Sequence, residues 1–274
     1  MQPPQASLTG SSESLRRVSR VERCLIVGVG MLVVGPTFVY CSRAEVAKWH
    51  LVAGFEQLLE NNVDRAIPLV DEAIRWNPAS QHLYERRAIW RMTTGSLEGV
   101  LADCEKALRI ARVVHSQQPT SQRGNESLAS TLNLTAYTRA LAGEDLDRAL
   151  AEINESLQIY PETSPGQLAP NILDTKGYIH YLRGEYRSGL ATMLKAVGRL
   201  ERDYRRDQSQ LKRLRQQTVD PRPIDYLREL NERSLAVCYH HLGLVYEKLG
   251  RTDLAEKNLK RGKDHGYDPA NGVW

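Results

Sequence analysis

Two stretches of the chain share a pattern of small and aromatic residues that decides its fold. Residues 176–186 read Lys-Gly-Tyr-Ile-His-Tyr-Leu-Arg-Gly-Glu-Tyr, and residues 242–251 read Leu-Gly-Leu-Val-Tyr-Glu-Lys-Leu-Gly-Arg. In each stretch the first glycine lets a neighbouring helix approach closely. The second glycine, seven residues later, suits the left-handed backbone that ends a helix. The pattern predicts the first helix and turn of a two-helix repeat, and a fold built by internal repetition.

A second pattern follows each predicted turn. A small residue, an apolar residue four positions later and another small residue three positions after that fall on one stripe of a helix. The stripe occurs five times, at Ala66-Val70-Ala73, Val100-Cys104-Ala107, Ala149-Ile153-Ser156, Gly189-Met193-Ala196 and Ala255-Leu259-Gly262. The first two stripes are in strict register, 34 residues apart, and prolines at 78 and 161 follow two of the predicted second helices. The stripes predict the second helix of each repeat.

This combination of a 34-residue period with Leu-Gly, Tyr, Ala and Pro positions resembles the tetratricopeptide repeat. The resemblance implies an all-α, right-handed superhelix of about five helix-turn-helix repeats within residues 44–274. The units would cover residues 47–80, 81–114, 129–162, 170–203 and 236–269. The last unit matches best, and the third departs most because Gly143 lies one residue early. The alternative is an ordinary helical bundle with chance glycines, which the strict register disfavours.

The spacing between the fourth and fifth units is too long for the period. Residues 187–217 contain no proline and only two glycines, and Pro223 is well placed in the first turn of a new helix. We therefore predict two overlong helices that form an antiparallel hairpin projecting from the superhelix. Its expected contacts join Leu200, Tyr204, Leu211 and Leu214 to Tyr226, Leu227 and Leu230. Loops are expected at 116–125 and 161–170.

An apolar run without charge covers residues 24–41, which is long enough for a short transmembrane helix. Four arginines precede it within residues 16–23, so the positive-inside rule predicts a single-pass protein with a cytoplasmic N-terminus and its repeats outside the cytoplasm. A cleaved signal peptide, giving a secreted protein, is the alternative, because Ser42-Arg43-Ala44 could serve as the cleavage site. Residues 1–23 are rich in Gln, Pro, Ser and Arg and are expected to be a disordered basic tail.

The charge of the chain argues against a nucleic-acid partner. Residues 1–43 hold 5 of the 37 basic and 2 of the 33 acidic residues, so the remainder is nearly neutral with 32 and 31. The arginines within 199–223 alternate with acids, which is typical of a solvated helix face. The metalloprotease, phosphate-loop and serine-nucleophile motifs are all missing from the sequence. No enzymatic activity, catalytic residue, cofactor or metal site is therefore expected, and His240-His241 is interpreted as polar helix filling.

In tetratricopeptide proteins the first helix of each unit lines the concave groove. By that resemblance the peptide-binding groove includes Glu85, Tyr137, Asp174, Tyr178, Tyr181, His240 and Glu247. Tyrosine and histidine with scattered acids suit an extended peptide or a helix with basic residues. The alternative is that Tyr178 and Tyr181 only pack neighbouring helices. The family's clamp for acidic peptide termini uses lysine and asparagine at these positions, so a co-chaperone role of that kind is not expected.

The sequence thus predicts a membrane-tethered scaffold or adaptor for protein–protein interaction. The alternative function is a noncatalytic assembly subunit of an envelope enzyme or secretion complex. The partner would be a protein or peptide, and self-association is the further alternative if no partner exists.

Overall fold

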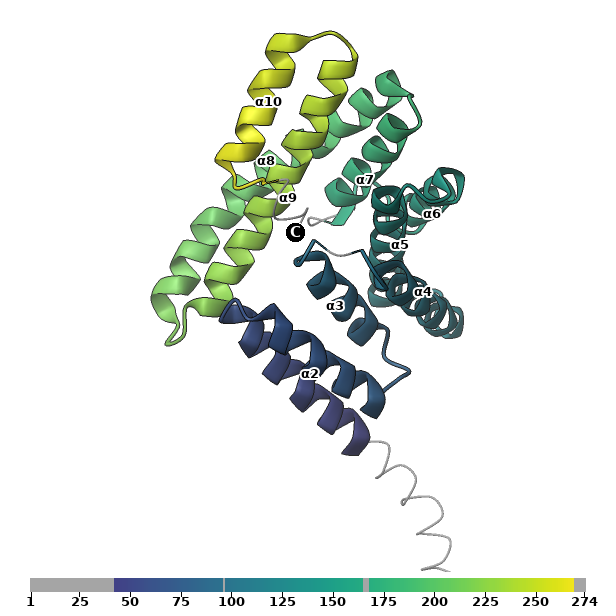
Figure 1. Ribbon diagram of the computed structural model, residues 1–274, viewed down its shortest axis with the longest axis vertical. Helices are drawn as coiled ribbons and strands as arrows, with labels where there is room; N and C mark the ends of the chain where they lie inside the picture. Colours follow the sequence, from purple (N-terminus) through teal and green to yellow (C-terminus); the bar gives the residue numbers. More distant parts are fainter. Residues whose placement is uncertain (1–41, 96, 165–167, 269–274) are drawn as a thin grey trace, which may run out of the picture. The chain divides into compact units, whose positions relative to one another are not determined.

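The computed structural model describes residues 42–95, 97–164 and 168–268, and the regular structure in these ranges is helical (Figure 1). The chain divides into two compact units, Met1–Glu45 and Val46–Trp274, and the predicted repeats lie in the second. The predicted tail and apolar run, residues 1–23 and 24–41, lie outside the described residues. Among the helices that the structure describes, none combines the length and the apolar character that crossing a membrane requires.

Helices follow one another in antiparallel pairs. A helix over residues 42–59 is followed by α2 (Val63–Trp76), α3 (Gln81–Met92), α4 (Val100–Gln117), α5 (Gln122–Ala142), α6 (Leu146–Ile159), α7 (Leu168–Leu182), α8 (Tyr186–Gln217), α9 (Arg222–Lys248) and α10 (Thr252–Asp264). From α2 onwards each helix packs on the next, and in addition α5 packs on α7 and α7 on α9. We call α3, α5, α7 and α9, with helix 42–59, the inner row. The all-α class predicted from the sequence is confirmed.

The glycines of the two opening stretches have the two roles predicted for them. Gly184 and Gly250, just beyond α7 and α9, have φ angles of 78° and 70°, the left-handed region that glycine enters at little cost. Gly177 and Gly243 lie where helices touch. A Cβ atom on Gly177 would lie 2.5 Å from Cγ of Met193, and one on Gly243 would lie 2.7 Å from Cγ of Leu259. The two glycines therefore set the closest approach of α7 to α8 and of α9 to α10.

The small and apolar stripes lie on second helices, as predicted, and they are buried apart from the half-buried Leu259. Eleven of their members have no exposed surface: Ala66, Val70, Ala73, Val100, Cys104, Ala107, Ala149, Ile153, Ser156, Met193 and Ala196. Alanine and serine at these positions keep the paired helices close, so the core is a row of small clusters between helices. Burial raises the pKa of the Cys104 thiol to about 12, which is consistent with its expected role as a small apolar residue.

Two buried ion pairs join first to second helices. Arg87 of α3 donates two hydrogen bonds to Asp103 of α4, at 2.8 and 2.5 Å. Arg139 of α5 contacts Glu152 of α6 at 3.3 Å, and the side chains of this second pair are 4% and 6% exposed. Each pair crosses from α3 to α4 or from α5 to α6, so each fixes the packing within one helix pair.

Three predicted boundaries are wrong. The first helix of the third unit begins at Gln122 and not at 129, because Ser121 caps it by accepting a hydrogen bond from the Gly124 amide. The loop expected at 116–125 is consequently only 118–121. The loop expected at 161–170 ends before Leu168, since Pro170 lies in the first turn of α7, where a proline removes no helical hydrogen bond.

The two overlong helices are confirmed: α8 has 32 residues and α9 has 27, or about 48 and 40 Å. They form an antiparallel hairpin in which the Tyr204 hydroxyl donates to Glu232 at 3.1 Å and Arg215 donates to Asp225 at 2.8 Å. Some predicted contacts across the hairpin are wrong, because Leu214 and Leu227 are 41% and 47% exposed.

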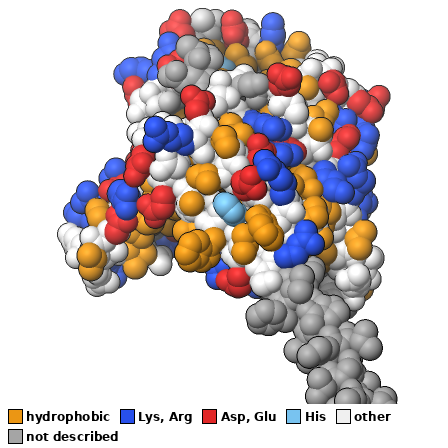
Figure 2. Space-filling model, turned by 60° about the horizontal axis from the view of Figure 1, so that its bottom comes forward, with side chains coloured by type: hydrophobic (Ala, Val, Ile, Leu, Met, Phe, Trp, Pro, Cys, Tyr) orange, Lys and Arg blue, Asp and Glu red, His pale blue; other side chains and the backbone are white. Residues whose placement is uncertain are grey.

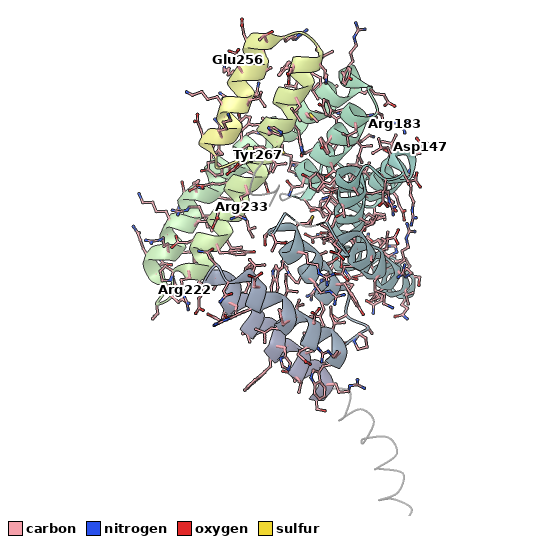
Figure 3. All side chains as sticks on the ribbon, in the orientation of Figure 1. Asp147, Arg183, Arg222, Arg233, Glu256 and Tyr267 are labelled. Atoms are coloured by element: carbon pink, nitrogen blue, oxygen red, sulfur yellow. The ribbon has the colours of Figure 1, made fainter. Side chains whose placement is uncertain are left out.

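The hairpin does not project freely, as the sequence had indicated, because its end returns to the first helix pair (Figure 1). The ring of Tyr226 packs edge-on against Phe55, with centroids 5.3 Å apart, and so faces helix 42–59 and not α8. Arg222, at the tip of the hairpin in Figure 3, contacts Glu56 at 3.4 Å. We call the contacts of Tyr226 and Arg222 with Phe55 and Glu56 the hairpin contact. The hairpin contact joins the first helix pair to the hairpin of α8 and α9, all within Val46–Trp274.

Replacing Tyr226 with alanine is expected to lower the free energy of unfolding by about 1–2 kcal/mol, because the aromatic pair and its buried area are lost. Hydrogen exchange should become faster within 46–60 and 222–234 and stay unchanged in α5 and α7. Leu227→Ala, on the exposed side of the same turn, is the matched control. It should change neither the free energy of unfolding nor the rate of hydrogen exchange. Unchanged exchange within 46–60 in the Tyr226 variant would contradict the hairpin contact.

Candidate functional site

A small cavity opens between three helices of the inner row. Its volume is about 70 Å³, and α5, α7 and α9 each contribute side chains one turn apart. The polar side chains around it are Asn133 and Tyr137 of α5, Asn171 and Asp174 of α7, and Ser234 of α9. The cavity is lined by α5, α7 and α9, which correspond to the predicted first helices of the third, fourth and fifth units.

Asp174 and His241 form a buried pair beside this cavity. Nδ1 of His241 lies 2.8 Å from Oδ2 of Asp174, and the two residues are 3% and 5% exposed. The imidazole ring stacks on Tyr178, with centroids 4.1 Å apart. These contacts fix the orientation of the Asp174 carboxyl group and connect α7 to α9.

Four tyrosine rings follow one another, three of them on the inner row and the fourth, Tyr186, at the start of α8. The ring centroids of Tyr137 and Tyr178 are 6.1 Å apart, those of Tyr178 and Tyr181 6.0 Å, and those of Tyr181 and Tyr186 5.9 Å. We call these four residues the tyrosine row. Tyr137 is buried, whereas the other three are half-buried.

Burial keeps two tyrosines and His240 near the cavity uncharged. It raises the pKa of Tyr178 to about 12 and that of Tyr137 well above its usual value, with a further contribution from the negative charge of Asp174. Burial, together with the neighbouring His241, lowers the pKa of His240 to about 4. At neutral pH the tyrosines are therefore hydroxyl donors and His240 is uncharged.

The structure brings together four of the seven groove residues predicted from the sequence: Tyr137, Asp174, Tyr178 and Tyr181. His240 lies next to this group but stacks on Tyr267, with centroids 3.9 Å apart. Figure 3 shows Tyr267 beside α9, near the middle of the molecule.

The other two predicted residues lie apart from the cavity. Glu85 is half-buried between α3 and α5, where its Oε1 accepts a hydrogen bond from the Thr131 hydroxyl at 2.5 Å. Glu247 is exposed in the last turn of α9. Neither carboxyl group lines the cavity, so among the described lining residues the acidic group is that of Asp174.

Sequence reasoning missed His241 as a site residue. A signal was present, because His241 lies two residues before Gly243, as Thr175 lies two residues before Gly177. Thr175 also lines the cavity, so superposing the two opening stretches would have assigned His241 to the inner row. Within the described ranges, no group of three His, Cys, Asp or Glu side chains could hold a metal ion.

The comparison with known families and structures agrees with this architecture. Residues 236–263, which begin in α9 and end in α10, match the model of the tetratricopeptide repeat. No curated protein matches the chain.

Two solved structures share the fold. BtubC (BKLC) from P. vanneervenii is 16% identical, with 92% of this chain and 94% of that chain covered and a TM-score of 0.51. A variant of a Podosopora anserina protein, described as a kinesin light chain with nearly identical TPR-like repeats, is 11% identical. In that comparison 81% of this chain and 95% of the other are covered, with a TM-score of 0.52. At these identities the likeness shows the fold alone.

These findings define the class of protein. The chain has an all-α fold of the tetratricopeptide type and carries a recognisable repeat of that kind at 236–263. Folds of this type stack helix pairs into a superhelix and typically present an extended surface to other proteins.

Proposed function

We propose that the chain is a five-unit tetratricopeptide scaffold that binds a peptide or helix of a partner protein on its inner row. The observation that carries this proposal is the tyrosine row beside a cavity formed by α5, α7 and α9. Half-buried tyrosines offer large, rigid contact area and a hydroxyl group at small cost in conformational entropy. The five helix pairs would be the five units.

Part of the tyrosine row also supports the fold. Tyr178 packs against the buried clusters on either side of it, and Tyr181 and Tyr186 pack against the cluster that contains Leu242 and Val245. The intermediate exposure of these rings fits a dual role, in which one edge packs on the core and the other meets the partner. The cavity next to Tyr137 would take a side chain of the bound segment.

The proposal includes a membrane tether formed by residues 24–41, with the repeats outside the cytoplasm. It is supported by the uncharged run in the sequence and the arginines before it. On helix 42–59, Trp49 and Val52 are 82% and 54% exposed, and exposed tryptophan is typical of membrane interfaces. Figure 2 looks onto the end of the molecule that carries this helix and shows apolar side chains between charged ones. Protease added to spheroplasts should digest the repeats, and their protection would contradict this orientation.

The binding function is tested by selecting ligands from a displayed library of random 12-residue peptides on the full chain. Selected peptides are then measured against Asn171→Trp, which fills the mouth of the cavity. The matched control is Asn154→Trp on α6, an asparagine of similar exposure that does not line the cavity. Binding should be lost in the first variant and kept in the second. Selected peptides that bind both variants as they bind the unchanged chain would contradict binding on the inner row.

A further inference from the structure

Two residues that line the cavity between α5, α7 and α9 each carry a buried acceptor atom without a strong donor. Oδ1 of Asp174 and Oδ1 of Asn133 have no hydrogen-bond partner in the described part of the chain. The other carboxyl oxygen of Asp174 is held by His241 at 2.8 Å, so the free oxygen cannot turn away without breaking that contact. A buried acceptor left without a donor costs free energy, which indicates that a donor from outside the chain belongs at this position.

Besides His241, a neighbour that can donate to Asp174 is the Cys238 thiol, which is a weak donor. Burial, the charge of Asp174 and a hydrogen bond with its carboxyl group raise the pKa of this thiol well above its usual value. None of the described residues that line the cavity is a lysine or an arginine, and the basic side chain that contacts the carboxyl group, His241, does so at Oδ2.

The walls of the cavity combine these acceptors with apolar side chains. Leu134 of α5 and Val237 of α9 line it together with Asn133 and Asp174. A volume of about 70 Å³ has room for about five non-hydrogen atoms, by the 10–15 Å³ that one water-sized centre requires. The lysine side chain has an apolar stem of four carbons and a compact ammonium group with three donors. The lysine side chain fits this volume. Its stem matches the apolar side chains of the walls, and its ammonium donors match the acceptors.

We propose that this cavity is a lysine pocket, in which the ammonium group of a partner's lysine binds between Asp174 Oδ1 and Asn133 Oδ1. The proposal rests on the function proposed above and gives the bound segment its chemistry. The lysine stem passes Leu134 and Val237, and the remainder of the segment lies along Tyr178 and Tyr181.

The test uses n-butylammonium, which reproduces the end of a lysine side chain, titrated into the full chain and followed by NMR. Saturable shifts are expected at the amides of Asn133, Asn171, Thr175 and Ser234. The neutral control is 1-butanol, which has the same shape without the charge and should shift these signals at least about tenfold more weakly. Equal responses to the two compounds would show that the cavity does not recognise the ammonium group, and no saturation by n-butylammonium would show that it holds solvent only. Either result would overturn the proposal.

Two variants separate the charge of the pocket from its shape. Asp174→Asn keeps the size of the side chain and should weaken n-butylammonium binding at least about tenfold. Asn133→Asp adds a second carboxyl group and should tighten n-butylammonium binding. This variant tests the proposal even if the Asp174 variant fails to fold. Glu247→Gln, which removes an exposed acid from the same inner row, is the matched control and should leave binding unchanged. A folded Asp174→Asn variant that binds as the unchanged chain does would overturn the proposal.

Failure of this inference differs from failure of the proposed function. If n-butylammonium binds while no selected peptide is sensitive to Asn171→Trp, the lysine pocket stands and peptide binding on the inner row is wrong. If selected peptides are sensitive to that variant but n-butylammonium does not bind, only the lysine pocket is wrong. If both hold, replacing the lysine of a selected peptide with norleucine should reduce its affinity at least about tenfold.

Discussion

Replacing Gly243 with leucine is expected to lower the free energy of unfolding by about 3 kcal/mol or more, which is the upper range for overpacking. A Cβ atom at this position would lie 2.7 Å from Cγ of Leu259 and 3.1 Å from its backbone nitrogen. The side chain of Leu259 could turn away, but the backbone of α10 could not. Helices α9 and α10 would therefore have to separate. Denaturant unfolding of the variant and the unchanged chain measures the loss.

Gly198 provides the matched control, because it also lies within a long helix but has open space around it. The only atom near a Cβ there is Nη1 of Arg202, at 3.8 Å. Gly198→Leu should leave stability unchanged or raise it by about 1 kcal/mol, since leucine favours helix more than glycine does. An unchanged free energy of unfolding in Gly243→Leu would mean that the register of the repeat at 236–263 is misassigned.

Replacing Arg139 with methionine is expected to cost about 3 kcal/mol, the lower end of the range for breaking a buried pair, because Glu152 keeps only the contact with the half-exposed Arg148 at 3.1 Å. The side chains of Arg139 and Glu152 are 4% and 6% exposed, and Arg139 also bonds Glu105 at 2.8 Å. Combining Arg139→Met with Glu152→Gln should recover part of the loss, since the uncompensated charge is then removed. Thermal and denaturant unfolding of the single and double variants measure both effects.

An exposed arginine serves as the control for this prediction. Arg183 pairs with Asp147 and Glu185 at the surface, where Figure 3 shows Arg183 and Asp147 close together. Solvent screens such pairs, so Arg183→Met should cost less than about 1 kcal/mol. If Arg139→Met costs no more than Arg183→Met, the buried pair does not hold α5 against α6.

The sequence predicts well what repeats along the chain. Small residues facing a neighbouring helix and glycines that end a helix recur with the period, so the stripes and the turns at Gly184 and Gly250 could be predicted. The acids of the two buried ion pairs follow the same register, because Asp103 and Glu152 directly precede Cys104 and Ile153. Their arginines do not, since Arg87 lies 16 residues before Asp103 and Arg139 lies 13 residues before Glu152. Sequence reasoning passed over this pattern although the signal was there.

Contacts between distant units depend on the curvature of the superhelix, which no single repeat encodes. The pairing of Tyr226 with Phe55 is of this kind, and so the hairpin was expected to project. The candidate site shows the same difference between features that a single repeat predicts and contacts that depend on how repeats are placed. Asp174 and Tyr178 could be predicted from the register of α7, whereas the pairing of Asp174 with His241 requires the placement of α9. Glu247 was misjudged because the end of α9 extends past the cavity.

The central claim is that the tyrosine row contributes binding surface and not only packing. Its direct test is the affinity of a selected peptide for the double variant Tyr178→Ala/Tyr181→Ala, measured by calorimetry together with a thermal melt of the same sample. The double change to phenylalanine is the control that keeps the rings. We predict that the alanine variant loses more than about 2 kcal/mol of binding free energy while remaining folded. A variant that melts at a much lower temperature but, while folded, binds the peptide with unchanged affinity would contradict the claim.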